Sequence, residues 1–428
     1  MNSNNISPHH ESEEQQLIDN IEKGSQLSDA LTNIKGYYWF LVIFLVLESA
    51  LGSFVNDMYS PSLPRMCSFF GCSISIGQLG LTMGMIGLAT GQLILGPLSD
   101  RYGRKPIMVG ALILFIAAAI VSIFSPSIHF FNGCRFFQGV GASGGYFLAR
   151  TIPADVLSGR SLAKLMALVG AINGIAPASA PVVGGLASDH WGWKSVFIIL
   201  AVFAVIVLIC SFRMKESLPP SRRTTGSWKQ SLQGYNALLH NKPFMIHVCF
   251  KGTALGLLFA YISSSPFILQ NHYGLSQTSY GLIVGFNALF VVVGSLLALK
   301  FHPLKKSAFT GAILLTAGVI LQAIALFHIK SLLLFEVCIA VMLFGLGMIF
   351  TTTNTLAMNE GRNSAGEASS ILGVSGYIFG AIVSPLVGLG NILHSTAITY
   401  VVMALFIMIY ALLSRTLAPD LQNDSSKK

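Results

Sequence analysis

The sequence is short of charged residues. Aspartate, glutamate, lysine and arginine make up 10% of its 428 residues, whereas typical soluble domains carry about 25%. Because 53% of the residues are hydrophobic, the chain cannot cover a globular surface mainly with polar side chains. This composition excludes an ordinary soluble protein and indicates a chain embedded in lipid.

The sequence also lacks the motifs of enzymes. Its apolar segments contain no cluster of metal ligands, no nucleophile next to a base and no phosphate-binding loop. The run "GVGASGG" at 139–145 is glycine-rich like a nucleotide loop, but it follows no strand and lies within an apolar segment. We therefore expect no enzymatic activity, no cofactor and no bound metal. A sensor is disfavoured as well, because no segment has the composition of a soluble signalling domain.

Cysteine is scarce, with six residues in the chain. Four stand singly in apolar segments, where they are most simply packing residues. Cys67 and Cys72 share one predicted outer loop, and their spacing leaves both a disulfide and free thiols open. Residues 1–36 are polar and acidic, which predicts a disordered tail and no cleaved secretory signal.

Long apolar runs dominate the rest of the chain. A helix needs about 20 apolar residues to cross a bilayer, and twelve stretches meet this requirement. We predict an all-α polytopic membrane protein with transmembrane helices at 37–58, 74–96, 107–124, 129–150, 162–186, 195–212, 243–269, 277–300, 307–327, 331–357, 367–390 and 394–414.

The positions of the basic residues predict the orientation. The net charge of +9 would suggest nucleic acid in a soluble protein, but lysine and arginine gather in the termini and in the loops on one side. The exceptions are Arg65, Lys194 and Lys330 on the other side, and Arg135 and Lys251 within predicted helices. Since positive charge resists translocation, we expect both termini in the cytoplasm, a location in the plasma membrane (the bacterial inner membrane), and no nucleic-acid partner.

A weak internal repeat divides the chain into two halves. Pro61 and Pro266, Pro181 and Pro385, and Gly139 and Gly345 occupy similar local sequences at offsets of 205, 204 and 206 residues. We predict two pseudo-symmetric six-helix halves that function as a monomer. The predicted parts are a cytoplasmic tail (1–36), an N-terminal half (37–212), a basic linker (213–242), a C-terminal half (243–415) and a second tail (416–428). Two halves around a central site are typical of carriers.

Arg135 stands inside a predicted helix, in "NGCRFFQGVGASGG" at 132–145. An arginine at the centre of a membrane helix costs about 2.5–3.5 kcal/mol, so a partner is expected. Asp57, near the outer end of the first helix, lies at a matching depth, and we predict an Asp57–Arg135 ion pair. A fixed structural pair is the alternative. Because an aspartate favours its charged form beside an arginine and its neutral form alone in an apolar cavity, the pair would couple cavity shape to a proton.

Two further ionisable residues, Glu48 and Lys251, are predicted at mid-membrane depth. Glu48 and Asp57 are half a turn out of phase, so both face the cavity only if the first helix is irregular. Lys251 maps by the repeat near the level of Glu48, where it either meets this acid or extends to the inner interface. Glu336, close to the end of its helix, is expected to reach water.

The stretch "GPLSDRYGRKPI" at 96–107 resembles the signature loop of the major facilitator superfamily. The resemblance implies the major facilitator fold and a latch between the halves on the cytoplasmic side. A turn that only sets topology is the alternative. The implied latch residues are Gly96, Asp100, Arg101, Gly103 and Arg104, with the acid facing the start of the eleventh helix.

Three other stretches narrow the resemblance. "GCRFFQGVGASGG" is similar to the helix 4 motif of proton-coupled members and places Arg135 and Gln138 on polar positions of the family. "GAINGIAPASAPVVGG" is similar to the helix 5 motif of antiporters, with Gly174, Pro181, Gly184 and Gly185 in the pattern. "NDMYSPSLP", "YISSSPFILQNHYGLS" and "ARTIPADV", with Arg150 and Asp155 at the cytoplasmic end of helix 4, resemble the Bcr/CflA group of drug exporters.

The resemblance implies a secondary active transporter that exports small drug-like molecules or metabolites in exchange for protons by alternating access. Asp57 would be the titrating group and Arg135 its modulator, with Glu48, Gln138 and Lys251 near the substrate. The partners would be the cargo, protons and the lipid bilayer. A proton-coupled uptake symporter for a small metabolite is the alternative, and Lys251 leaves an anionic or zwitterionic cargo open.

Overall fold

The computed structural model describes residues 35–157, 159–223, 235–301, 303–328 and 331–416. Within these ranges the chain consists of helices and loops. The predicted tails fall outside them, apart from residues 35–36 and 416. The long helices of the first half are α2 (Lys35–Asp57), α4 (Ile74–Tyr102), α5 (Arg104–Ile123), α6 (Ile128–Val156), α7 (Gly159–Trp191) and α8 (Lys194–Arg213).

The second half also contains six long helices. These are α10 (Lys242–Phe267), α11 (Gln277–Ala298), α12 (Leu304–His328), α13 (Leu332–Glu360), α14 (Ala365–Val383) and α15 (Ile392–Thr416). Short elements join or extend them: η1 (Ser60–Ser62), α3 (Leu63–Phe70), η2 (Pro220–Arg222), the π-helical turn η3 (Ile268–His272), η4 (Arg362–Ser364) and η5 (Leu386–Gly388).

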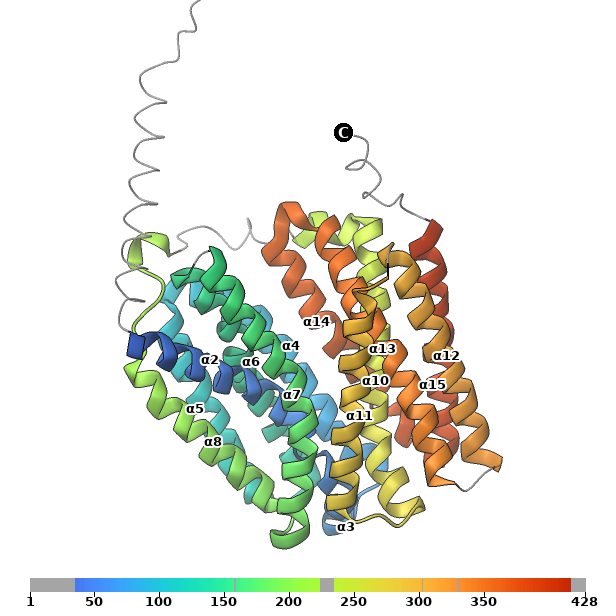
Figure 1. The fold of residues 1–428 in the computed structure, drawn as a ribbon. Helices are drawn as coiled ribbons and strands as arrows, with labels where there is room; N and C mark the ends of the chain where they lie inside the picture. Colours follow the sequence, from blue (N-terminus) through green and yellow to red (C-terminus); the bar gives the residue numbers. More distant parts are fainter. Residues whose placement is uncertain (1–34, 158, 224–234, 302, 329–330, 417–428) are drawn as a thin grey trace, which may run out of the picture.

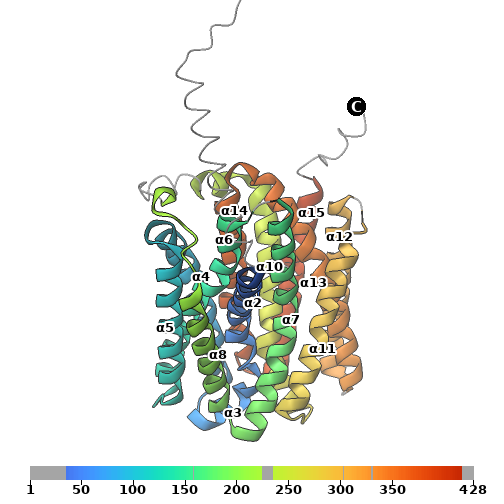
Figure 2. The same cartoon turned by 60° about the vertical axis from the view of Figure 1, so that its left-hand side comes forward.

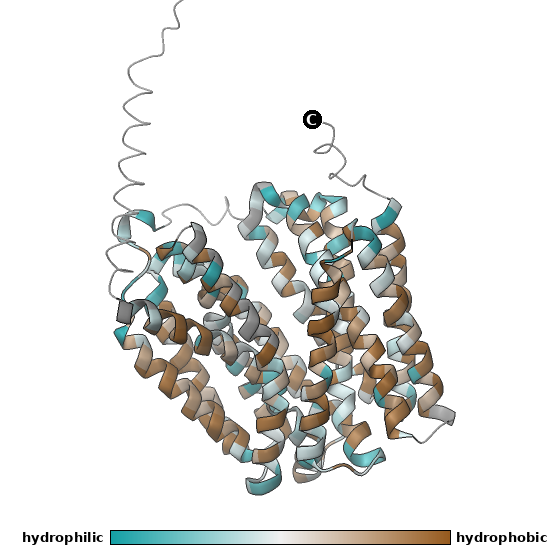
Figure 3. Cartoon of the chain, viewed as in Figure 1, coloured by the Kyte–Doolittle hydropathy of each residue, from teal (hydrophilic) through white to brown (hydrophobic). Residues whose placement is uncertain are grey.

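The long helices are suited to a membrane. Among the described residues, ten helical segments are long and apolar enough to cross one, and α6 and α7 are also long but richer in small and polar residues. Figure 3 shows hydrophobic residues along the middle of the helices and hydrophilic ones near their ends. Large apolar side chains such as Ile209, Phe212 and Leu405 are exposed, as expected for lipid-facing positions. The chain is a multi-pass membrane protein, as the apolar runs predicted.

The helices form two groups, α2 to α8 and α10 to α15 (Figures 1 and 2). We call the end of the bundle that carries α3 the α3 end, and the end where α8 stops and α10 begins the linker end. The groups lie close together at the α3 end and spread at the linker end (Figure 1). The predicted two-half architecture is present.

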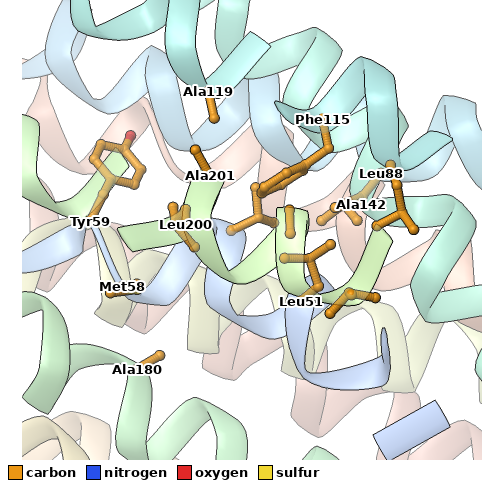
Figure 4. Packing of buried hydrophobic residues seen from close by; sticks show 14 of the residues in the cluster. Leu51, Met58, Tyr59, Leu88, Phe115, Ala119, Ala142, Ala180, Leu200 and Ala201 are labelled. Carbon is orange, nitrogen blue, oxygen red and sulfur yellow. The ribbon is translucent and has the colours of Figure 1, made fainter. Parts of the chain in front are cut away.

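The bundle contains two large hydrophobic cores. In the first half, side chains from different helices interdigitate (Figure 4), among them Leu51 of α2, Leu88 of α4, Phe115 of α5 and Leu200 of α8. The second core is built from α10 to α15. The first core also includes Phe259 and Phe267 of α10, so the two halves pack against each other at this helix.

Glycines bring α4 and α6 into close contact. A Cβ atom at Gly87 would overlap the backbone oxygen of Phe136, and one at Gly139 would overlap that of Gly84. Small residues at such spacing let membrane helices approach closely. The resulting α4–α6 pair is the scaffold that holds Arg135.

Candidate functional site

A central cavity of about 730 Å³ lies between the two halves. This volume is in the range of small-molecule sites. Most of its lining is apolar, and Asp57 is the charged residue among the described residues that line it. The lining residues that matter below are Ser53, Asn56, Asp57, Ser60, Tyr146, Pro181, Leu255, Phe259, Tyr261, Phe350 and Tyr377.

Arg135 is fully buried, and its partners are neutral groups. The guanidinium donates from Nη2 to Asn56 Oδ1 at 2.9 Å and to the Val55 oxygen at 2.6 Å, and from Nη1 to Gln138 Oε1 at 2.5 Å. It also stacks on Tyr59, with 4.3 Å from Cζ to the ring centroid. Among the described residues, no ion pair or hydrogen bond joins Arg135 to Asp57, so the predicted pair is wrong for this structure.

The absence of an Asp57–Arg135 pair from this structure has a simple geometric reason. Successive residues of a helix point about 100° apart, so Asn56 and Asp57 face different neighbours although they share a depth. Asn56 points to α6, and Asp57 points into the cavity. The predicted depth was therefore right and the predicted direction was wrong by one residue.

The end of α2 itself compensates the charge of Arg135. The last carbonyl groups of a helix lack intrahelical partners and carry a partial negative charge, and Val55 is within the last turn of α2. A cation there is favourable by about 0.3–1 kcal/mol, and by about 2 kcal/mol when partly buried. Gly84 of α4 leaves room for this contact, because a Cβ there would lie 2.5 Å from Asn56 Oδ1 and 3.1 Å from Arg135 Nη2.

Glu48 is buried away from the cavity. Both of its carboxyl oxygens are buried without a hydrogen-bond partner, and they lie over Gly145 of α6, where a Cβ would be 2.9 Å from Oε1. The helix α2 is continuous from Lys35 to Asp57. Glu48 and Asp57 therefore do not share the cavity face, as their phase on a regular helix indicated.

Lys251 does not meet Glu48. Its Nζ donates to Asn354 Oδ1 of α13 at 2.7 Å. Arg150, nearly two turns from the end of α6, stacks on Tyr146 at 4.4 Å and donates to its hydroxyl at 2.7 Å. Both cations thus have neutral partners near the linker end of the cavity.

The signature loop ties together helix ends within one half. Arg104 Nε bonds Asp155 Oδ2 at 2.8 Å, and its Nη1 bonds Asp100 Oδ1 at 2.5 Å. Glu216, after α8, accepts from the backbone nitrogens of Arg104 and Lys105. Asp100, Arg104 and Asp155 are thus brought together as a network at the ends of α4, α5, α6 and α8.

The cross-half latch predicted at this loop is absent among the described residues. The physical reason is the spread of the halves at the linker end, which separates the loop from the start of α14. Gly103 adopts a positive φ of 106°, a conformation that favours glycine, and it leaves space for the Glu216 carboxylate. Arg101 is exposed, and a Cβ at Gly96 would make only ordinary van der Waals contact with Phe147.

The halves are joined by hydrogen bonds at the α3 end. Ser60 Oγ bonds the Tyr280 hydroxyl at 2.7 Å, and Gln270 Nε2 donates to the Pro61 oxygen at 2.9 Å. Gln78 Nε2 donates to the Ser263 oxygen at 3.0 Å. Each bond connects the first half to the second, so this end is closed.

Asp189 at the end of α7 adds a charged contact to this closure. Its Oδ2 accepts from the backbone nitrogen of Thr278 at 2.8 Å and from its hydroxyl at 2.6 Å, in the first turn of α11. An acid at a helix N-terminus is stabilising. The kind of latch predicted for Asp100 therefore exists, at the opposite end and with another acid.

The glycines and proline of the helix 5 motif lie at the seam between the halves. A Cβ at Gly184 would overlap the Met58 oxygen, and one at Gly185 would overlap the Gln277 oxygen. In return, Gly281 of α11 packs on the Pro181 oxygen. Gly174, predicted with them, lies outside the residues whose surroundings are described.

The structure also describes Glu336 and the two cysteines of the predicted outer loop. Glu336 does not simply reach water, because its Oε2 accepts from Asn287 Nδ2 at 2.6 Å and its Oε1 is buried without a partner. Cys67 and Cys72 are both free cysteines.

Sequence reasoning missed several neutral residues of the site. Asn56 and Tyr59 hold Arg135, Tyr146 and Tyr377 line the cavity, and Asn354 holds Lys251. Only Asn56 had a visible signal, as the neighbour of the aspartate in "VNDMYSP".

Comparisons with known proteins agree with this architecture. The profile of the Major Facilitator Superfamily matches residues 45–385. The uncharacterized MFS-type transporter YdgK of Bacillus subtilis is 35% identical over 358 residues, which are 82% of this chain and 89% of the relative. Multidrug resistance protein MdtL of Salmonella typhimurium is 30% identical over 324 residues, covering 74% of this chain and 80% of the relative.

Solved structures show the same fold. A bacterial homologue of the human lysosomal transporter Spinster matches with a TM-score of 0.72 at 15% identity, covering 89% of this chain and 97% of that structure. A D-xylose-proton symporter matches with a TM-score of 0.71 at 17% identity, covering 90% and 98%. The family and these relatives are transporters and not enzymes. The chain therefore belongs to the Major Facilitator Superfamily and has its fold of twelve transmembrane helices.

Proposed function

We propose that this transporter exports lipophilic small molecules in exchange for protons across the bacterial inner membrane. The linker end faces the cytoplasm, as the distribution of basic residues predicts. The structure then corresponds to a state that receives cargo from the cytoplasm, because the α3 end is closed. The proton gradient supplies the energy, with no cofactor, and one chain with both halves is the functional unit.

The observation that carries the proposal is the position of Asp57. Among the described residues, it is the charged residue that lines an otherwise mostly apolar cavity between the halves, and an ionisable residue at membrane depth is a functional candidate. Its neighbour Asn56 is fixed by Arg135. Any movement of the end of α2 therefore changes the surroundings of Asp57, which links the shape of the cavity to binding of a proton.

The cavity lining favours a lipophilic cargo over a sugar. Leu255, Phe259 and Phe350 are among many apolar lining residues, and apolar groups form most of the lining surface. A polyhydroxylated cargo would need many hydrogen bonds there. The name of the relative MdtL, a multidrug resistance protein, supports the same cargo class, and the motifs quoted above support the Bcr/CflA type.

The test uses purified full-length protein in liposomes with a trapped pH indicator. Three probes share one aromatic body: neutral dansylglycinamide, anionic dansylglycine and cationic dansylethylenediamine. We expect at least one probe to exchange for protons, and Asp57→Asn to abolish this flux without lowering the melting temperature. If the Asn variant still moves protons when the probe is added, the assignment of Asp57 is wrong.

The direction of flux separates export from uptake. Under an imposed pH gradient, an antiporter drives the probe against the proton flow. A probe that accumulates on the same side as the protons would identify a symporter.

A further inference from the structure

Three polar side chains surround the cytoplasmic mouth of the cavity. Arg150 of α6, Lys251 of α10 and Asn354 of α13 each lie four residues from a lining residue of the same helix, namely Tyr146, Leu255 and Phe350. Residues four apart lie on the same helix face. In each helix the polar residue is the one nearer the linker end. The three side chains therefore lie one helical turn from the apolar cavity toward the linker end, where cargo enters in the proposed function.

The two cations at this mouth have no acid to balance them. Among the described residues, no carboxylate pairs with Arg150 or Lys251. Their hydrogen-bond partners are the Tyr146 hydroxyl and the Asn354 side chain, both neutral. Lys251 and Arg150 carry like charges, and each lies one helical turn from a residue that lines the cavity. Unbalanced positive charge at membrane depth is costly and marks a functional position.

We propose that Arg150 and Lys251 bind an anionic group of the cargo, a carboxylate, sulfonate or phosphate, while its apolar body fills the cavity. The inference rests on the proposed function in treating this cavity as the cargo site. Guanidinium and ammonium groups form strong, charge-assisted hydrogen bonds with such oxyanions. Tyr146, stacked under the guanidinium at 4.4 Å, holds Arg150 at the mouth.

The two cations belong to different halves, and this gives the anion a second role. Without cargo, their repulsion favours a spread linker end. An anion between them removes the repulsion and attracts both halves, so it binds more tightly when this end closes. Such differential affinity is the condition for a ligand to drive a conformational change.

The experiment compares binding of dansylglycine and dansylglycinamide, which differ in charge and hardly in shape. Full-length protein in phosphatidylcholine nanodiscs is titrated with each probe, and the dansyl fluorescence reports binding. We expect dansylglycine to bind about tenfold more tightly. Arg150→Gln and Lys251→Gln should each reduce this preference to about threefold or less, and Lys251→Arg should keep it.

Lys300→Gln is the matched control, because it removes one exposed positive charge at the linker end outside the mouth. It should leave the preference unchanged. Equal binding of the two probes by the wild type, or a preference that survives both Gln variants, would overturn the inference. The variant Lys251→Arg keeps the test valid if a Gln variant does not fold, since it must then behave like the wild type.

Nanodiscs with added phosphatidylglycerol distinguish a cargo from a lipid headgroup. A cargo site keeps its preference for dansylglycine there, whereas a loss of the preference would assign the mouth to anionic lipid and contradict the inference. The inference and the proposed function can fail separately. Proton exchange of a probe without preference for the anion overturns only the inference, and preferred binding of the anion without any proton exchange overturns only the proposed function.

Discussion

Arg135 of α6 donates a hydrogen bond to Asn56 of α2 at 2.9 Å, and the next residue, Asp57, lines the central cavity. The arginine therefore holds the end of the helix that carries the acid, without contacting the acid. Its second bond, to the Val55 oxygen at 2.6 Å, fixes the same turn. The buried cation acts on the acid by positioning the backbone that carries it.

Replacing Asn56 by alanine should destabilise the protein. Arg135 would lose an acceptor that no water can easily replace at this buried site, and a hydrogen bond to a charged group contributes about 1.5–3 kcal/mol. The thermal unfolding midpoint in detergent should fall clearly. Ser68→Ala, at an exposed position of α3 whose hydroxyl bonds the Pro64 oxygen of the same helix, serves as the control and should have little effect. Equal melting of both variants would show that Arg135 does not depend on Asn56.

Replacing Gly84 by alanine should disturb the same contact from the side of α4. The new Cβ would lie 2.5 Å from Asn56 Oδ1 and 3.1 Å from Arg135 Nη2, and overpacking of this kind costs about 1–3 kcal/mol. Gly133→Ala is the control, because a Cβ there meets nothing within 4 Å and a helical alanine stabilises by about 0.4–1 kcal/mol. The two variants should therefore shift the melting temperature in opposite directions. A shift in the same direction would contradict the packing argument.

The fold could be predicted from the sequence because the membrane imposes a strong rule. Each crossing needs about 20 apolar residues, and the predicted segment 37–58 became α2 at Lys35–Asp57 while 243–269 became α10 at Lys242–Phe267. The sequence also predicted the two helices that are richer in glycine and polar residues. The predicted segments 129–150 and 162–186 lie within α6 and α7. Helix ends were less predictable: α14 stops at Val383, where the sequence predicted a span to residue 390.

The site was predictable in depth and not in direction. The level of Arg135 was correct, but one sequence does not show whether Asn56 or Asp57 faces α6, because that depends on how α2 is rotated. The latch shows a similar limit. Acids stand near helix ends at both Asp100 and Asp189, and which one meets a helix N-terminus depends on which end of the transporter is closed.

Replacing Arg104 by alanine should weaken the linker end of the first half. Arg104 is buried and bonded to Asp155, whose side chain is 13% exposed, and breaking a buried pair by removing one partner costs about 3–5 kcal/mol. The neighbouring Arg101→Ala, at an exposed position, should change stability by no more than about 0.5 kcal/mol. Chemical denaturation in mixed micelles measures both. If Arg101→Ala is the more harmful variant, the network around Arg104 is not the main support of this loop.

Replacing Asp189 by alanine should loosen the closure at the α3 end. The side chain accepts two hydrogen bonds from Thr278 at the start of α11, and loss of such a cap costs about 0.5–2 kcal/mol. Because this contact joins the halves, the loss should appear as a shift of the conformational equilibrium by about two- to thirtyfold. Spin labels at the exposed positions His190 and His272, in a background without native cysteines, report the distance across this end. A longer-distance population should grow in Asp189→Ala and grow less in Asp189→Asn, which keeps an acceptor oxygen. An unchanged distance distribution in the alanine variant would mean that the bonds of Ser60, Gln78 and Gln270 close this end without help from Asp189.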